Sequence, residues 1–232
     1  MWTRKELKTR AKAGLKQNYW KSVLVAFLYG AIVVGSGSVS TSGASDGNST
    51  GISAILSTVS SGDMAAVLSL MFGMVLLSGL VAVAIQAFCA NPVAVGAAKF
   101  SCSANDGTAP MSDISAGFKF NYLANVKTVF LKNLFICLWS LLLVIPGIIK
   151  AYEYAMVEYL IADDPNLTTK EALAKSKAMM QGNKWNLFVL QLSFIGWDIL
   201  SALTFGLLQL FYVAPYRMLT TAALYQKLKE NA

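Results

Sequence analysis

Charged residues interrupt some of the most apolar parts of this sequence. The segment LLLVIPGIIKAYEYAMVEYLIADDP (residues 141–165) begins like a membrane span and then carries three charges before its ADDP end. Carboxylates and cations in apolar surroundings can pair, bind an ion or a lipid headgroup, or transfer protons. The candidate site residues of this kind are Lys150, Glu153, Glu158, Asp198 and Arg217.

Their expected depth makes these charges costly. If the chain re-enters the membrane after Pro146-Gly147, Glu153 lies about 9 Å deep and Glu158 about 16 Å deep, at 1.5 Å per helical residue. A charge at the centre of a bilayer costs at least about 2.5–3.5 kcal/mol and normally faces a partner or a wet cavity. Partners or water are therefore predicted for both glutamates.

Mutual pairing is the simplest solution. We predict that Arg217 pairs with Asp198 or Glu158, and that Lys150 pairs with Glu153 at the i,i+3 spacing. Such a cluster either fixes the packing and register of helices or forms a site for an ion, a proton or a headgroup. The sequence leaves both interpretations open.

Three residues are candidates for helix breaks in these segments. Pro146 and Gly147 predict a very short turn between two spans, and Gly196 lies inside a later apolar segment. Broken helices of this kind line the sites of transporters, although Gly and Pro also produce turns and close packing.

Composition identifies the class of protein. Of 232 residues, 56% are apolar and 13% are charged, against roughly 25% charged in ordinary soluble domains. The mean hydropathy is +0.54. There is no histidine, and the three cysteines show no CxxC spacing, so we expect no metal or other cofactor.

The net charge of +7 indicates partners at the membrane surface. The positive residues lie beside apolar spans, which points to anionic lipid headgroups and to membrane topology, and not to nucleic acid. A stripe of small residues in the second span favours a homo-oligomer, and the basic helices offer a docking surface for a membrane partner protein.

The predicted fold is all-α: a polytopic membrane helical bundle of six transmembrane helices with amphipathic surface helices at the N-terminus and between spans 4 and 5. Residues 1–20 form the basic N-terminal helix, and residues 21–232 form a single membrane domain. The predicted spans are 21–36, 64–90, 126–145, 148–162, 185–206 and 207–225. Asn91-Pro92 is expected to kink or end the second span.

Two basic segments predict the surface helices. Thr3 followed by Glu6 and Thr168 followed by Glu171 both match capping boxes. The apolar face of the first helix (Trp2, Leu7, Ala11, Leu15 and Tyr19) is expected to lie in the membrane interface while cations face headgroups. The basic residues predicted at the membrane surface are Arg4, Lys5, Lys8, Arg10, Lys12, Lys16, Lys170, Lys175 and Lys177.

The distribution of lysine and arginine predicts the orientation. Six spans place all the basic segments on one side, which the positive-inside rule makes cytoplasmic together with both termini. The opposite side begins with a Ser- and Gly-rich loop at 36–51, followed by a short surface helix at 52–61.

Three motifs carry a resemblance. The stretches IPGIIKAYEYAMVEYLIADDP, SKAMMQGNKWNLFVLQLSFIGW and PYRMLTTAALYQKLKE resemble the bacterial integral-membrane family called "domain of unknown function 975" over residues 117–229. The resemblance implies a six-span protein of the cytoplasmic membrane, chiefly in Gram-positive bacteria. It also implies a distant likeness to the membrane domains of some glycerophosphodiester phosphodiesterases, but no reaction.

The functional hypotheses follow from these observations. The first is a non-enzymatic membrane protein that transports or binds an ion, peptide or lipid at the charged residues. The alternative is a structural or partner protein that docks on anionic lipid or on another membrane complex. An intramembrane enzyme would have to use a carboxylate pair as acid and base, because no recognisable nucleophile motif occurs.

Overall fold

The computed structural model describes residues 2–38, 64–119 and 121–230, and every regular element in these ranges is helical. The predicted all-α class is confirmed. The loop and surface helix predicted within 36–61 fall outside the described residues from position 39 onward. The elements are α1 (Arg4–Gln17), α2 (Tyr19–Ser38), α4 (Met64–Ile85), η2 (Gln86–Ala90), α5 (Asn91–Asn105), η3 (Met111–Ser115), α6 (Ala116–Lys119), α7 (Tyr122–Leu142), α8 (Val144–Glu153), α9 (Val157–Asp163), α10 (Thr169–Met180), α11 (Lys184–Leu192), α12 (Ile195–Leu203), η4 (Gln209–Val213) and α13 (Ala214–Glu230).

Apolar helices identify a membrane protein. Among the described residues, three helical stretches are long and apolar enough to cross a bilayer, and they span 71–105, 122–142 and 184–203. A shorter apolar helix covers Tyr19–Ile32. The count of six membrane spans stays a prediction, and so does the division of the chain into a basic N-terminal helix and one membrane domain.

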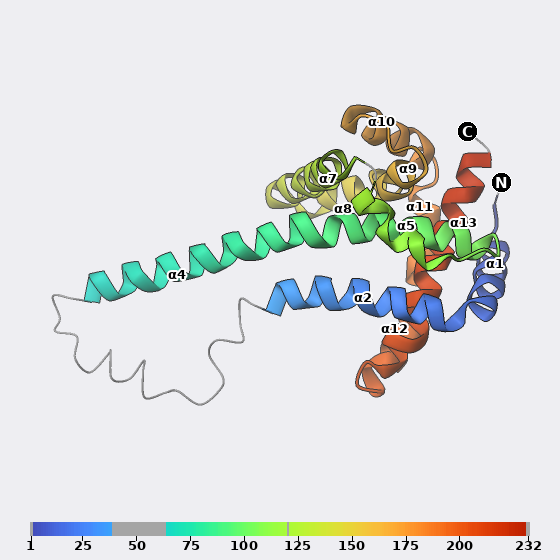
Figure 1. The fold of residues 1–232 in the computed structure, drawn as a ribbon, viewed down its shortest axis with the longest axis horizontal. Helices are drawn as coiled ribbons and strands as arrows, with labels where there is room; N and C mark the ends of the chain where they lie inside the picture. Colours follow the sequence, from blue (N-terminus) through green and yellow to red (C-terminus); the bar gives the residue numbers. More distant parts are fainter. Residues whose placement is uncertain (1, 39–63, 120, 231–232) are drawn as a thin grey trace.

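The longest rod runs from α4 through η2 into α5 (Figure 1). Helix α2 lies along it, whereas α1 and the end of α13 lie at the opposite end from the tip of α4. Large apolar side chains of α4 project outward, and Phe72, Leu80 and Met74 are 65%, 68% and 70% exposed. A lipid environment would cover this surface.

The rod passes Pro92 without ending. The helix continues because a π turn, η2, precedes the proline. Pro92 has no N–H to offer the carbonyl oxygen of Phe88 four residues earlier. The Tyr122 hydroxyl donates to that oxygen at 2.8 Å instead.

Helix α1 packs its apolar face on protein. Leu7, Ala11 and Leu15 are 2%, 0% and 4% exposed, because α13 and α5 cover them. The prediction that this face lies in the membrane interface is therefore wrong. The predicted start is correct in part, since the Thr3 hydroxyl accepts from the Glu6 N–H. The basic residues occupy the other side of the helix, with Arg4, Lys5, Lys12 and Lys16 exposed and Lys8 and Arg10 half-buried.

Helix α10 has the complete capping box that the sequence predicts. The Thr168 hydroxyl accepts from the Glu171 N–H, and the Glu171 carboxylate accepts from the Thr168 N–H. The hydrogen bond from this N–H lowers the pKa of Glu171 below its usual value. Lys170, Lys175 and Lys177 are exposed along the helix.

Candidate functional site

The five charges predicted within the membrane form three separate ion-pair groups. The Arg217 guanidinium donates from Nη2 to both oxygens of Asp198, at 2.8 and 2.6 Å. Lys150 Nζ lies 2.6 Å from Glu153 Oε2. Both pairs are among those that the sequence predicts. Glu158 is paired instead with Lys132 of α7, which sequence reasoning missed because Lys132 was not among the candidate charges.

Glu153 is the most deeply buried of these charges. Its side chain is 7% exposed and contacts two ammonium groups, Lys150 and Lys184, each at 2.6 Å. The two partners approach different carboxylate oxygens. Desolvation of a charge is costly unless each oxygen is satisfied, and here each oxygen has its own cation.

The backbone breaks directly after Glu153. Helix α8 ends there, and α9 begins only at Val157. Ser176 of α10, which is fully buried, bridges the gap. Its hydroxyl donates to the Glu153 carbonyl at 2.8 Å and accepts from the Met156 N–H at 3.2 Å. The segment predicted as one span at 148–162 therefore consists of two helices, and the Ser176 side chain connects them through two hydrogen bonds.

The predicted breaks at Pro146, Gly147 and Gly196 are displaced. The turn before α8 lies at Leu143, whose backbone is extended, and Pro146 and Gly147 fall inside α8. Proline is tolerated in the first turn of a helix because its missing N–H has no partner there. Gly147 instead permits close packing, since a Cβ added to it would lie 2.6 Å from Ser140 Cα.

Gly196 likewise lies inside a helix, α12. The interruption falls at Ser193 and Phe194, between α11 and α12.

The last apolar segment has the same arrangement as the helix around Pro92, a π turn that precedes a proline. A second π turn, η4, precedes Pro215. The carbonyl of Phe211, four residues before this proline, accepts from the Tyr19 hydroxyl at 3.1 Å. The two stretches share one pattern, QAFCANP (86–92) and QLFYVAP (209–215). Gln, Phe and Pro occupy the same positions in both.

An internal repeat explains this correspondence. The start of the chain aligns without gaps on the segment 165 positions later, so that α1 and α2 correspond to α10 and α11. The two proline stretches, and with them α5 and α13, align at 123 positions, because more residues separate α2 from its proline stretch than separate α11 from its own. Both copies consist of a capped basic helix, an asparagine and an apolar helix with an early tryptophan. The matching identities are Thr3 and Thr168, Lys5 and Lys170, Glu6 and Glu171, Lys12 and Lys177, Ala13 and Ala178, Asn18 and Asn183, and Trp20 and Trp185.

A cavity of about 420 Å³ lies where the two copies meet. Equivalent positions of the two copies line this cavity. Ala26 is equivalent to Gln191, and Ala98 is equivalent to Thr221. Its walls come from α2, α5, α11, η4 and α13, with α9 adding Glu158. We name this space the central cavity.

Two buried polar atoms in its walls have no partner. Within the described ranges, neither Arg217 Nε nor Gln209 Oε1 makes a hydrogen bond, although both atoms are inaccessible to solvent. Arg217 and Gln209 both line the central cavity. A buried donor and a buried acceptor without partners are costly, and because solvent does not reach these two atoms, they do not face the open space of the cavity.

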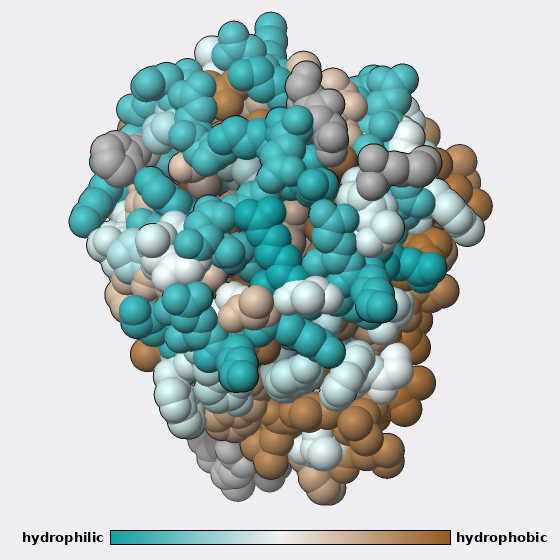
Figure 2. All heavy atoms as spheres, turned by 90° about the vertical axis from the view of Figure 1, so that its right-hand side faces the viewer, coloured by the Kyte–Doolittle hydropathy of each residue, from teal (hydrophilic) through white to brown (hydrophobic). Residues whose placement is uncertain are grey.

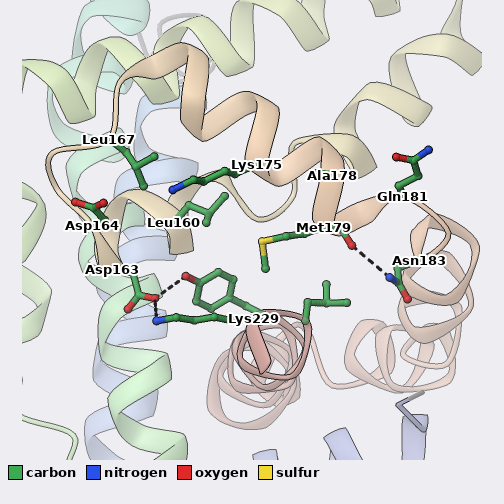
Figure 3. Close-up of a pocket in the computed structure, with 12 residues that line it drawn as sticks. Leu160, Asp163, Asp164, Leu167, Lys175, Ala178, Met179, Gln181, Asn183 and Lys229 are labelled. Atoms are coloured by element: carbon green, nitrogen blue, oxygen red, sulfur yellow. Dashed lines mark hydrogen bonds and ion pairs between the residues drawn. The ribbon is translucent and has the colours of Figure 1, made fainter. Parts of the chain in front are cut away.

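A second cavity, of about 660 Å³, lies between α9, α10 and the end of α13. Tyr225 and Lys229 converge on Asp163, and Figure 3 shows Lys229 beside this carboxylate. The tyrosine hydroxyl and the lysine ammonium each lie 2.6 Å from one oxygen of this carboxylate. Because these groups satisfy one another, this cavity makes a weaker case for a ligand than the central cavity does.

Comparison with known proteins identifies the family. The family described as "protein of unknown function (DUF975)" matches residues 111–232, which is more than half of the chain, and the chain belongs to it. No curated protein and no solved structure matches. The resemblance that the sequence motifs indicated is confirmed, whereas the likeness to phosphodiesterase membrane domains stays a prediction.

Proposed function

We propose that this member of the DUF975 family is a non-enzymatic membrane protein. It binds a small polar solute in the central cavity and transports it across the membrane. The observation that carries the proposal is the polar lining of this cavity, to which Gln191, Gln209 and Thr221 contribute. A donor and an acceptor in one wall suit a ligand that has both kinds of group.

The charges around the cavity favour a ligand without net charge. Arg217 is already paired with Asp198, and Glu158 is already paired with Lys132. A bare ion would leave a surplus charge beside these pairs, whereas a zwitterion or a neutral polar molecule would not. The volume of about 420 Å³ lies within the range of roughly 300–1,000 Å³ that is usual for small-molecule sites.

Irregular backbone beside the cavity supports the same function. Ala155 lies in the break between α8 and α9, and Gln209 lies in a π turn, and both line the cavity. Non-helical backbone at membrane depth is tolerated where it is buried in protein or lines a cavity. Transporters place their sites at such breaks, near the interface between internal repeats.

The first test measures whether the cavity is wet. On a background in which the three cysteines are replaced, Thr221→Cys should react with a membrane-impermeant hydrophilic thiol reagent. Leu80→Cys, on the outward surface of α4, should react only after detergent exposes it. If Thr221→Cys stays unlabelled in folded protein, the cavity is dry, and the structural or partner role takes precedence.

The second test measures binding. We expect the protein in lipid nanodiscs to be stabilised against heat by members of a panel of zwitterionic amino acids. Gln209→Leu should weaken this effect about tenfold, the cost of one lost hydrogen bond to a buried group. Gln86→Leu changes the equivalent glutamine outside the cavity and should leave binding intact. An equal loss in both variants, or no stabilisation by the panel, would contradict the proposal.

A further inference from the structure

A second site lies at the hydrophilic end of the molecule, on α1. A recess of about 410 Å³ opens between this helix and the interruption that separates α11 from α12. We name it the cationic recess. Its lining consists of Arg4, Lys5, Lys8, Thr9 and Lys12, with Ser193 and Tyr216 opposite.

The positive charges of the recess are not neutralised by the protein. Within the described part of the chain, no carboxylate pairs with any of its four cations. The ion pairs of α1 are made instead by Arg10, to Asp106 and Glu230, and by Glu6, to Lys227.

Crowding of like charges is therefore strongest around Lys8. Burial and the neighbouring Arg4 and Lys12 lower the pKa of this lysine, in that order of size. Its ammonium lies 4.8 Å from the centre of the buried Phe194 ring. An anion placed among these cations would relieve their repulsion.

An aromatic groove adjoins the recess. It has a volume of about 710 Å³, shares Arg4 and Lys5 with the recess, and is otherwise lined by Trp2, Thr3, Trp185, Asn186 and Val189. Trp185 is 71% exposed. Tryptophan is enriched where a protein meets the boundary between headgroups and acyl chains.

Apolar surface continues from this groove along the following helices. Leu192 and Ile195 are about half-exposed, on either side of the interruption at which the recess opens. Figure 2 shows the same transition for the whole end of the molecule, where a hydrophilic face gives way to apolar surface at its lower edge.

We propose that the cationic recess binds the phosphate of an anionic phospholipid, whose glycerol and upper acyl chains lie along the tryptophan groove. A soluble phosphate would use only the cations, whereas a lipid uses the cations and the apolar surface beside them. The site is independent of the central cavity, so it stands if that cavity proves dry.

The test uses the full-length protein in neutral detergent, titrated with short-chain phosphatidylglycerol. Tryptophan fluorescence reports binding, and phosphatidylcholine and glycerol 3-phosphate serve as comparison ligands. The variant Lys8→Gln/Lys12→Gln removes two charges from the recess. Lys170→Gln/Lys177→Gln removes two charges from the exposed side of α10 and is the matched control.

We expect the recess variant to bind phosphatidylglycerol about 30-fold more weakly, since one lysine near an anionic surface contributes about a factor of five. The α10 variant should stay within about twofold of the unmodified protein, because a distant exposed charge acts only through the general field. Unmodified protein should prefer phosphatidylglycerol to both comparison ligands.

Three results would overturn the proposal. Equal losses in the two variants would show attraction by net charge alone. Binding of glycerol 3-phosphate as tight as that of the lipid would show a soluble phosphate site. Phosphatidylcholine bound equally well would show that the anionic charge is irrelevant. A thermal unfolding curve of the recess variant that matches the unmodified protein establishes that the variant is folded.

Discussion

Replacing Ser176 by alanine should remove the hydrogen bonds that hold the backbone at the break between α8 and α9, and so lower the stability of the protein. The Ser176 hydroxyl is the partner of the Glu153 carbonyl and of the Met156 N–H, and the serine is 0% exposed. Alanine removes the hydroxyl and adds no atom that could clash. Water cannot replace the lost hydrogen bonds unless the surrounding helices open.

The magnitude follows from the two backbone groups left without partners. Each buried polar group that loses its hydrogen bond costs about 1–3 kcal/mol. For both groups together we expect a loss of about 2–6 kcal/mol in the free energy of unfolding, a large part of the roughly 5–15 kcal/mol that stabilises a typical protein.

Ser101→Ala is the matched control. Ser101 is also fully buried, but its hydroxyl donates at 2.6 Å to the Ala97 carbonyl within the same helix. That carbonyl can also accept the Ser101 N–H of the regular helix, so this substitution should cost less than about 1 kcal/mol. Unfolding in mixed micelles of a mild and a denaturing detergent would measure both. If the two alanine variants were equally stable, the hydrogen bonds of Ser176 would not stabilise the break between α8 and α9.

Three further predictions concern single contacts. Gly147→Ala should destabilise, because the added Cβ would lie 2.1 Å from Ser140 Oγ. The Cβ added by Gly196→Ala meets no atom within 4 Å. This variant should raise the melting temperature, since alanine gains about 0.5–1 kcal/mol over glycine inside a helix. A higher melting temperature for Gly147→Ala than for Gly196→Ala would contradict the close packing at Gly147. Glu171→Gln should lower the melting temperature near neutral pH and have no effect in acid. The folded pKa of Glu171 is lowered, so the stability that its charge contributes is present above the unfolded pKa and is lost as the pH falls through the folded pKa; a difference independent of pH would contradict the charge effect. Lys132→Met should destabilise more than the double substitution with Glu158→Leu, because the single change leaves a largely buried carboxylate without its cation; thermal unfolding of both variants compares them.

Local patterns in the sequence predict local structure well. The capping box at Thr168 and the i,i+3 pair of Lys150 with Glu153 both occur as their spacing indicates. Pairing of Arg217 with Asp198 could also be predicted, because each charge in an apolar segment needs a partner. These rules require only the chain near each residue, or a simple count of charges.

Contacts between distant segments could not be predicted in this way. The apolar face of α1 looked suited to lipid because periodicity shows that a face is apolar but not what covers it. In the same way, hydropathy marked residues 148–162 as one span, since the break depends on a serine hydroxyl from another helix. Ser176 is one of several serines in the sequence, and only the fold places it beside Glu153 and Met156.

The internal repeat is the signal that could have located the central cavity from the sequence. The glutamines of the two π turns, Gln86 and Gln209, are equivalent in the repeat, yet only Gln209 lines the cavity. In the second copy, moreover, Arg217 stands where the first copy has Ala94, and both residues line it. At three equivalent positions that line the cavity, the first copy has alanine and the second copy has glutamine, arginine and threonine. The polar side chains of the second copy are therefore the groups that the proposed ligand would contact.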